Sequence, residues 1–312
     1  MTERKEEVAA CADMPLVPPI PQHGEQGKDE AVTVPDIFTL RDEAGQPKKI
    51  ADRHWIEQSL YFAELSRFAY LCDQESKSIF SSIGTEEIHF LDRDGAQAYL
   101  LGTKDDLIVV CRGTEPHEWN DLKADANAWT VLAEVGRLHR GFKREVDDLW
   151  PMIERAIREN QRPVWFAGHS LGGAMATVCA GRCKLSSIPS NPKALFTFGS
   201  PRVGNRAYIH AVKLPHYRWV HNNDIVARVP PRWLGYKHSG FELYLDSSDR
   251  LRNIVSWNRV RDRFRGFWTG LLMGRIDYFS DHPIRTYIQA IRGCWVEHKN
   301  GMQFPNPKVF VE

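Results

Sequence analysis

The sequence lacks any long run of apolar residues. Its apolar clusters extend over a few residues each, whereas a membrane-spanning helix needs about 20. The first 30 residues mix charges of both signs with proline, where a secretory signal would need a continuous apolar stretch. We therefore expect neither a signal peptide nor a transmembrane helix, and cytoplasmic residence is the default expectation.

The chain also lacks an excess of charge of either sign. Its 41 basic and 40 acidic residues give a formal net charge of +1. A charge this small creates no global field that would attract a polyanion. We therefore expect no nucleic-acid partner, and the composition leaves the oligomeric state open.

The cysteines lack the spacing of a metal site. None of the six belongs to a CxxC or CxxH pair. Cys179 and Cys183 lie one helical turn apart and Cys111 ends a strand-like run, which favours buried reduced thiols over a disulfide framework. We predict no metal site, and reduced thiols fit a cytoplasmic protein.

The 312 residues divide into a proline-rich start and a longer part that can form a core. Residues 1–50 contain six prolines among charged residues, a composition typical of an extended or flexible arm. Residues 51–312 are expected to form one domain. Its first helix should lie within 52–72, where apolar residues recur at helical spacing behind Asp52 as a cap.

The pattern of apolar segments predicts an α/β fold. Three strand-like runs separated by turn signals, at 86–91, 97–102 and 107–113, indicate an antiparallel meander. Further along the chain, helical and strand-like segments alternate: a helix at 141–160, a strand at 163–168, a helix at 171–183, and strands at 193–200 and 217–224. Because continuously apolar strands are buried on both faces, we predict a mixed, mostly parallel central sheet with helices on both sides.

The segment VWFAGHSLGGAMATVCA has the form of a nucleophile elbow. Gly168, His169, Ser170, Leu171 and Gly172 match G-x-S-x-G, in which a tight turn between strand and helix exposes a serine. The flanks agree with this interpretation, since an apolar strand precedes the motif and small helix-forming residues follow it. The alternative is a glycine-rich connection whose serine only caps a helix.

A serine nucleophile needs a histidine base and a carboxylate, which in elbow enzymes follow in the order acid, histidine. Asp224 comes directly after an apolar strand and is the candidate acid, although an ordinary Asx turn would also place it there. His282 precedes Pro283, which favours a loop position before a new helix. His238 is the rival base.

The motifs GHSLGGA, TFGSPRVGN, HNNDIVARVPP and DHPIRTY together resemble the class 3 lipase family, over about residues 60–292. This resemblance implies an α/β-hydrolase that cleaves carboxylic esters. Motif by motif, it places the nucleophile at Ser170, the acid at Asp224 and the base at His282.

The same resemblance identifies oxyanion donors. The family motif R-G-[ST] appears here as Arg112-Gly113-Thr114. It implies that Thr114 donates to the oxyanion together with the backbone N–H of Leu171, a position that suits the residue after the nucleophile. Thr114 could instead be a turn residue at a strand end.

In the family a short lid helix follows this motif. In the corresponding segment, Trp119, Leu122, Ala126 and Trp129 recur at helical spacing and form one apolar stripe. The stripe could close over an acyl pocket or pack against the sheet. The segment is otherwise strongly charged, which argues against a broad oil-binding face and leaves small esters, monoacylglycerols and phospholipids open as substrates.

A second amphipathic segment lies at 257–275. Its apolar residues recur at helical spacing beside four arginines, as in helices that lie in a membrane interface. Such a helix could make peripheral contact with a lipid surface. Alternatively, it covers a sheet and leaves its arginines in water.

These observations predict a serine carboxylic-ester hydrolase of the lipase type, acting on acyl esters of lipids or acylglycerols through an acyl-enzyme. Such a mechanism requires no metal and no organic cofactor. Two alternatives remain: a phospholipase or acyltransferase using the same triad, and a non-catalytic interaction protein that retains the fold.

Overall fold

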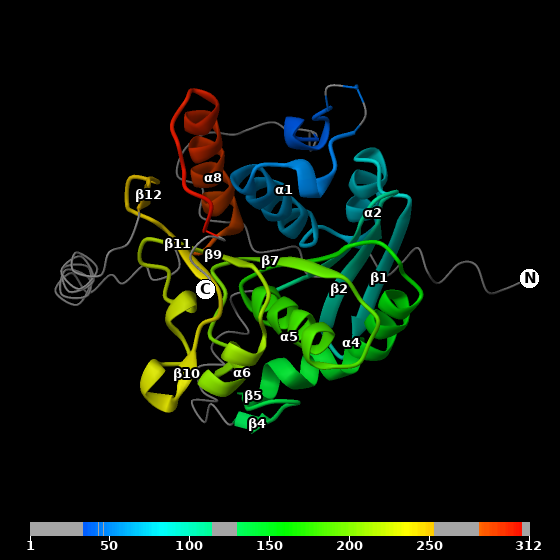
Figure 1. Ribbon diagram of the computed structural model, residues 1–312, viewed down its shortest axis with the longest axis vertical. Helices are drawn as coiled ribbons and strands as arrows, with labels where there is room; N and C mark the ends of the chain where they lie inside the picture. The colour runs from blue at the N-terminus through cyan, green and yellow to red at the C-terminus, as the bar shows by residue number, and fades with distance from the viewer. Residues whose placement is uncertain (1–33, 43, 46, 114–129, 253–280, 308–312) are drawn as a thin grey trace, which may run out of the picture.

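An eight-stranded sheet runs through the centre of the molecule, in the order β1-β2-β3-β6-β7-β9-β11-β12 (Figure 1). A computed structural model of the chain describes residues 34–42, 44–45, 47–113, 130–252 and 281–307. The strands of this sheet are β1 Glu87–Arg93, β2 Ala96–Gly102, β3 Leu107–Cys111, β6 Val164–His169, β7 Pro192–Phe198, β9 His216–His221, β11 Phe241–Leu245 and β12 Leu251–Arg252.

The strand directions confirm the predicted mixed sheet. β1, β2 and β3 pair antiparallel, as expected for the meander. From β3 onward, β6, β7, β9 and β11 pair parallel to their neighbours, and β12 returns antiparallel at the edge. The carboxyl ends of these parallel strands therefore meet at one edge, where α/β sheets present reactive groups.

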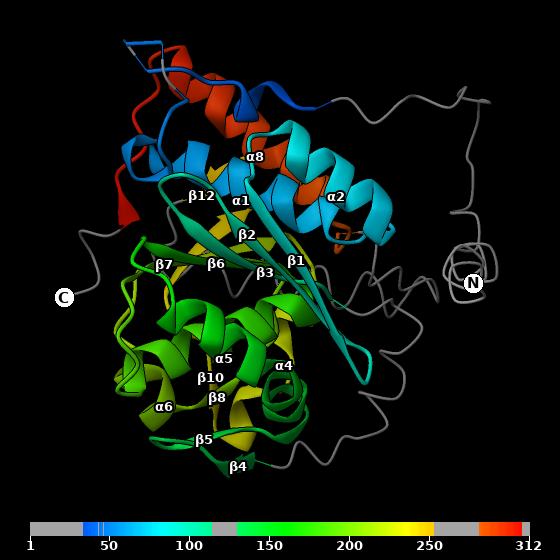
Figure 2. The same cartoon turned by 90° about the vertical axis from the view of Figure 1, so that its right-hand side faces the viewer.

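Helices cover both faces of the sheet (Figure 2). One face carries α1 Trp55–Phe68, α2 Asp73–Ser82 and α8 Ile284–Lys299, and the other carries α4 Arg140–Arg158 and α5 Leu171–Leu185. The strand side chains alternate between the two resulting cores: Ile108 packs with α1, whereas Val109 packs with α4 and α5. This alternation explains why β3 and β6 are buried along their whole length.

The first long helix starts later than the sequence indicates. Asp52 was expected to cap it, but Asp52 ends a short 3-10 helix, η2 Ile50–Asp52. The N-cap of α1 is His54, whose side chain accepts a hydrogen bond from the Ile56 N–H at 3.4 Å. The expected Asp52 cap is therefore wrong, because Asp52 closes the turn of η2 and two residues, Arg53 and His54, separate it from the helix.

A second, four-stranded sheet lies beneath α5, in the order β10-β8-β5-β4 (Figure 2). Its strands are β4 Thr130–Leu132, β5 Arg137–His139, β8 Gly204–Asn205 and β10 Tyr236–Lys237; α6 Arg206–Ala211, η3 Val226–Arg228 and η4 Arg232–Leu234 are close to them in the chain. We call it the small sheet. Every strand in it belongs to a connection that leaves the carboxyl end of β3, β7 or β9.

Residues before α1 pack onto the same core. Ile37 and Phe38 of η1 Asp36–Phe38, together with Ile50 of η2, are buried against α1. These positions fall within the segment expected to form an arm. The extent of the arm stays a prediction, because residues 1–33 lie outside the described part of the chain.

The cysteines of the described residues form no disulfide. Of these five cysteines, four are buried and Cys72 is exposed. Among the described residues, no helix combines the length and apolarity needed to cross a bilayer.

Candidate active site

Ser170 occupies a tight turn between β6 and α5. Its φ of +57° is positive, a backbone conformation that residues other than glycine rarely adopt. The turn therefore holds the serine in a strained conformation. The flanking glycines allow close approach of backbones: a Cβ on Gly168 would lie 2.3 Å from the Gly172 carbonyl oxygen, and one on Gly172 would lie 2.2 Å from the Cys111 carbonyl oxygen. The sequence GHSLG therefore forms the elbow geometry that its pattern indicates.

His282 lies within hydrogen-bonding distance of this serine. Its Nε2 is 2.8 Å from Ser170 Oγ, and its Nδ1 is 2.9 Å from Asp224 Oδ2. The three side chains come from the elbow, the turn after β9 and the loop before α8. All three residues are buried. The structure thus brings together the three residues that the sequence selects as nucleophile, acid and base.

The hydrogen-bond partners determine where the protons lie. An ionised Asp224 carboxylate only accepts, so Nδ1 of His282 carries the hydrogen and donates it. Nε2 then has a free lone pair that accepts the Ser170 hydroxyl hydrogen. In this tautomer the imidazole can remove the serine proton, and the carboxylate is positioned to stabilise the charge that results.

Asp224 is fixed by partners besides the histidine. Its Oδ1 accepts the Val226 N–H at 2.8 Å, and its Oδ2 accepts the Tyr287 hydroxyl at 2.5 Å. Its own N–H donates to the His221 carbonyl oxygen. These hydrogen bonds fix the orientation of the buried carboxylate.

Tyr287 was not identified by sequence reasoning as a site residue. It lies in the first turns of α8, five positions after His282. Burial, followed by the neighbouring Asp224 carboxylate, raises the pKa of Tyr287 well above its usual value, so the hydroxyl remains protonated and donates. Its place within DHPIRTY was visible in the sequence, but no spacing rule links a tyrosine there to an acid on another loop.

Of the two residues expected to donate to an oxyanion, the structure describes Leu171. Leu171 is the first residue of α5, so its backbone N–H is among the four that a helix leaves unpaired and lies at the positive end of the helix dipole. Thr114 lies outside the described residues, as do the expected lid residues Trp119, Leu122, Ala126 and Trp129.

His238, the rival base, has another partner. Its Nε2 is 2.7 Å from the Ala227 carbonyl oxygen. Burial, followed by the charges of Arg218 and Arg202, lowers the pKa of His238 well below its usual value. Its position favours a structural role in the loop after β9.

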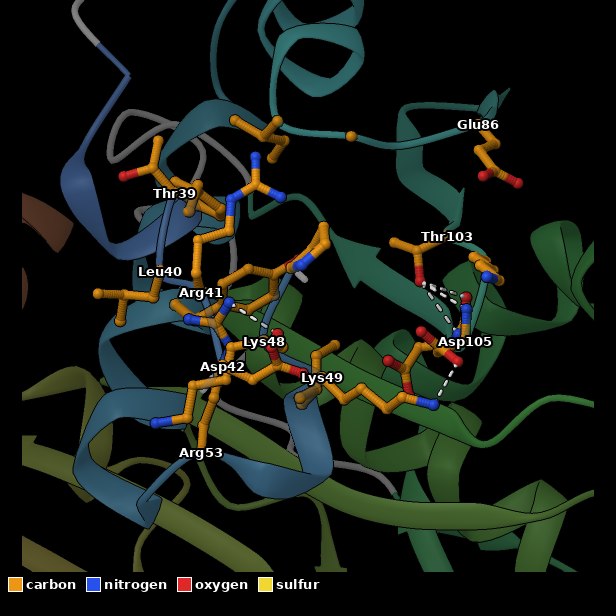
Figure 3. A pocket seen from close by; sticks show the side chains of 18 of the residues that line it. Thr39, Leu40, Arg41, Asp42, Lys48, Lys49, Arg53, Glu86, Thr103 and Asp105 are labelled. Carbon is orange, nitrogen blue, oxygen red and sulfur yellow. Dashed lines mark hydrogen bonds and ion pairs between the residues drawn. The ribbon is translucent and has the colours of Figure 1, made fainter. Parts of the chain in front are cut away.

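A cavity of about 660 Å³ opens at the other end of the sheet (Figure 3). Thr103 and Asp105, which line it, precede the amino end of β3, whereas the elbow pairs with the carboxyl end of that strand. An ion pair of 2.8 Å joins Lys49 Nζ to Asp105 Oδ1 on its wall. The cavity is therefore separate from the serine site.

The described residues contain no group of three or more His, Cys, Asp or Glu side chains arranged to hold a metal ion. The segment 257–275, expected to contact lipid, lies outside the described part of the chain.

Comparisons with known proteins agree with this geometry. Residues 108–233 match the family model "Lipase (class 3)". A secreted mono- and diacylglycerol lipase of Fusarium solani is 36% identical over 49% of this chain and 49% of its own length. A lipase of Rhizopus niveus is 34% identical over 36% of this chain and 31% of its own. The chain thus spans about half or less of these curated relatives.

Solved structures show the same fold. The Rhizomucor miehei lipase propeptide complex matches with a TM-score of 0.55 at 23% identity, covering 63% of this chain and 70% of that chain. A second structure, of a triacylglycerol lipase described as having a serine protease triad as its catalytic centre, matches with a TM-score of 0.54 at 22% identity over 66% of this chain and 89% of that chain. The predicted α/β-hydrolase fold is confirmed.

Proposed function

We propose that this chain is a class 3 lipase that hydrolyses carboxylic esters, with acylglycerols and other acyl lipids as the substrate class; the match of residues 108–233 to that family model and the similarity to fungal lipases support this. One observation carries the proposal: Ser170 Oγ, the two nitrogens of His282 and Asp224 Oδ2 form a continuous chain of hydrogen bonds of 2.8 and 2.9 Å. That arrangement activates a hydroxyl for attack on an acyl carbon.

Acylation begins when Ser170 Oγ attacks the ester carbonyl carbon. The hydroxyl proton passes to His282 Nε2, and the imidazolium that forms is stabilised by Asp224. The negative oxygen of the tetrahedral intermediate lies at the start of α5, where the Leu171 N–H donates to it; Thr114 is the proposed second donor. Collapse breaks the bond to the leaving oxygen, which takes the proton from His282 Nε2.

Deacylation repeats these steps with water as the nucleophile. His282 removes a proton from water, which attacks the acyl carbon, and Ser170 leaves with that proton restored. Every group in this sequence belongs to the protein, the ester or water. An acyltransferase would differ only in using an alcohol as the acceptor of the acyl group in place of water.

The decisive experiment compares two serines that each contact a histidine. Ser170 contacts His282, which in turn contacts a carboxylate. Ser239 Oγ lies 2.7 Å from His216 Nδ1, but the other nitrogen of that ring contacts the Thr197 hydroxyl. We expect Ser170→Ala to lose hydrolysis of activated esters by about 10⁴-fold or more, and also covalent labelling by a fluorophosphonate.

Ser239→Ala is the matched control and should be labelled at the wild-type rate. Equal ester hydrolysis by wild type and Ser170→Ala would end the assignment. A wild-type protein that neither hydrolyses esters nor reacts with the probe would favour the non-catalytic alternative.

The two candidate bases are separated by a second pair of variants. His282→Ala should be nearly inactive, because it removes the imidazole that hydrogen-bonds to Ser170 Oγ and would accept its proton. His238→Ala should retain most activity, because His238 contacts the Ala227 carbonyl instead. The reverse pattern would transfer the base role to His238.

Within the substrate class we favour partial glycerides over triglycerides. The Fusarium solani relative is named as a mono- and diacylglycerol lipase, and the lid segment of this chain is strongly charged. Rates on monoacyl-, diacyl- and triacylglycerols of one chain length, with a phosphatidylcholine in parallel, test this preference. A dominant rate on phosphatidylcholine would support the phospholipase alternative.

We also propose peripheral contact with a lipid surface through residues 257–275, supported by the basic and apolar pattern of that segment. Replacing Arg259, Arg261, Arg263 and Arg265 with glutamine should weaken sedimentation with anionic vesicles and leave hydrolysis of a soluble ester unchanged. Equal sedimentation of variant and wild type would remove the contact.

Cytoplasmic residence stays a proposal, supported by five free thiols among the described residues. The relative from Fusarium solani is named as secreted. Fractionation of cells that produce the full chain decides between the two, and recovery of the protein from the medium would overturn the proposal.

A further inference from the structure

His169, the first of the two variable residues of the elbow motif, joins the base to a tyrosine that follows α1. Its Nε2 lies 2.7 Å from the backbone carbonyl oxygen of His282, and its Nδ1 lies 2.9 Å from the hydroxyl of Tyr70. Tyr70 follows the carboxyl end of α1 and reaches the elbow from there. His169 itself is buried, with 5% of its surface exposed.

These partners allow one tautomer of His169. A carbonyl oxygen only accepts, so Nε2 must carry the hydrogen and donate it to His282. In the neutral ring Nδ1 is then the acceptor, and it receives the Tyr70 hydroxyl hydrogen. Burial, followed by the charge of His282, lowers the pKa of His169 well below its usual value, which keeps the ring in this neutral form.

The neutrality of His169 matters because of where the ring lies. The centroids of the His169 and His282 rings are 4.6 Å apart. His282 becomes positively charged during each proton transfer, and a second positive charge at this distance would oppose that step. A neutral donor can hold the base without this penalty.

The backbone of His282 is held from two sides. On one side, the preceding residue Asp281 accepts hydrogen bonds from Asn222 Nδ2 at 3.0 Å and from the Asn223 N–H at 3.1 Å. On the other side, the His282 carbonyl accepts from His169. Helix α8 begins only at Ile284, so His282 lies before the helix, and these bonds contribute to the position of its backbone.

We propose that His169 and Tyr70 form a positioning pair, in which Tyr70 fixes the tautomer of His169 and His169 fixes the backbone of His282 so that Nε2 faces Ser170. The inference rests on the proposed esterase activity. The hydrogen bond from this pair to the base goes to the backbone of His282 and not to its ring, so we expect the pair to affect how often the base is aligned and to leave substrate binding unchanged. A misplacement of about 1 Å at a reacting group lowers rates by about 100-fold.

The test compares His169→Phe with His169→Gln. Phenylalanine keeps a planar ring but cannot donate to the His282 carbonyl, and we expect kcat on a soluble ester to fall about 10- to 100-fold with KM unchanged. Glutamine carries a donor and an acceptor atom bonded to one carbon, as the neutral imidazole does, and should recover most of that loss. A purely structural role would lower the melting temperature of the two variants without this difference in kcat.

Tyr70→Phe tests the second member of the pair. Loss of the hydroxyl should lower kcat about three- to tenfold, the effect of one neutral hydrogen bond. In a ¹⁵N imidazole spectrum, His169 should change from the pure Nε2–H tautomer to a mixture. Tyr99→Phe is the control, since the Tyr99 hydroxyl donates to Asp73 in α2 and should leave both readouts unchanged.

The outcomes distinguish a failure of the positioning role from a failure of the proposed ester hydrolysis. Wild-type kcat in a folded His169→Phe, or equal loss in His169→Phe and His169→Gln, would overturn the positioning role while leaving the esterase assignment intact. An inactive and unlabelled wild type would overturn the esterase assignment instead. In that case the ¹⁵N spectra of wild type and Tyr70→Phe still test the hydrogen bond between the pair.

Discussion

Tyr287 donates a hydrogen bond of 2.5 Å to Asp224 Oδ2, the same oxygen that lies 2.9 Å from His282 Nδ1. A second contact fixes the tyrosine, because its hydroxyl oxygen accepts the backbone N–H of His221 at 3.1 Å. The helix that follows the base thereby holds the acid.

Tyr287→Phe should weaken catalysis without removing it. The variant loses a hydrogen bond to a charged group, worth about 1.5–3 kcal/mol, and leaves the His221 N–H without its acceptor. We expect kcat to fall about tenfold, KM to change little, and the free energy of unfolding to decrease by about 1–3 kcal/mol. Steady-state kinetics measure kcat and KM, and urea unfolding measures the free energy of unfolding. An unchanged kcat would show that the hydrogen bonds to Val226 and His282 are enough to orient the Asp224 carboxylate.

Gly113→Ala should disturb the site from the side of β3. An added Cβ would lie 2.3 Å from the Tyr70 hydroxyl and 2.8 Å from the His169 carbonyl oxygen, so one of these groups must move. We expect slower fluorophosphonate labelling of Ser170 and a loss of stability of about 1–3 kcal/mol, typical of overpacking. The matched control is Gly293→Ala in α8, where nothing lies within 4 Å of the new Cβ; it should stabilise the protein by up to about 1 kcal/mol. Equal labelling by the two variants would contradict the close packing at Gly113.

Arg53→Leu should destabilise the protein strongly. The buried guanidinium donates to the Ile37 and Lys48 carbonyl oxygens and pairs with Glu57, whose side chain has no exposed surface. Its loss leaves a buried carboxylate with one remaining partner, a change that costs about 3–5 kcal/mol. Arg155→Ala removes a solvent-exposed pair with Glu159 and should cost less than about 0.5 kcal/mol. Urea unfolding measures the stability of both variants. Equal midpoints would show that the hydrogen bonds of Arg53 to residues 34–52 do not contribute to stability.

Stability should decrease in mild acid. Burial holds the pKa of His169, His216 and His238 well below the usual value, so these rings stay neutral in the folded protein. In the unfolded chain each takes up a proton below about pH 6.5. The unfolded state then binds more protons, so the free energy of unfolding is highest above pH 6.5 and decreases below it, by at most about 1.4 kcal/mol per pH unit for each histidine.

His216→Gln isolates one of these contributions. Urea unfolding between pH 5 and 7 should give a flatter pH dependence than the wild type, by up to about 1.4 kcal/mol per pH unit. His210→Gln, at an exposed position, should leave the dependence as in the wild type. Parallel curves for wild type and His216→Gln would contradict the neutral state of the buried ring.

The main sheet could be predicted from the sequence, because its central strands are buried on both faces. β3, β6, β7 and β9 are short apolar runs between turn signals and helical segments, and they lie where those runs occur. The small sheet could not be predicted. Its strands have two or three residues, too few to show a period of two, and they pair only because the main sheet brings their connections together.

The candidate triad was predictable because each member lies in a motif of its own. The residues that hold the triad carry no comparable signal. Tyr70 lies 99 positions before His169, and no local sequence pattern predicts their contact. Asp281 directly precedes His282, but its bonds to Asn222 and Asn223 depend on the fold bringing two loops together.

The small sheet joins three connections whose conformations would otherwise be independent of one another. β5 pairs with β8 and β8 pairs with β10, so the segments that follow β3, β7 and β9 share backbone hydrogen bonds. Shortening one of them would leave a neighbour with unpaired N–H and C=O groups. Loop grafts from a relative should therefore be made as a set of three, because a single foreign loop would lose its partners in the small sheet.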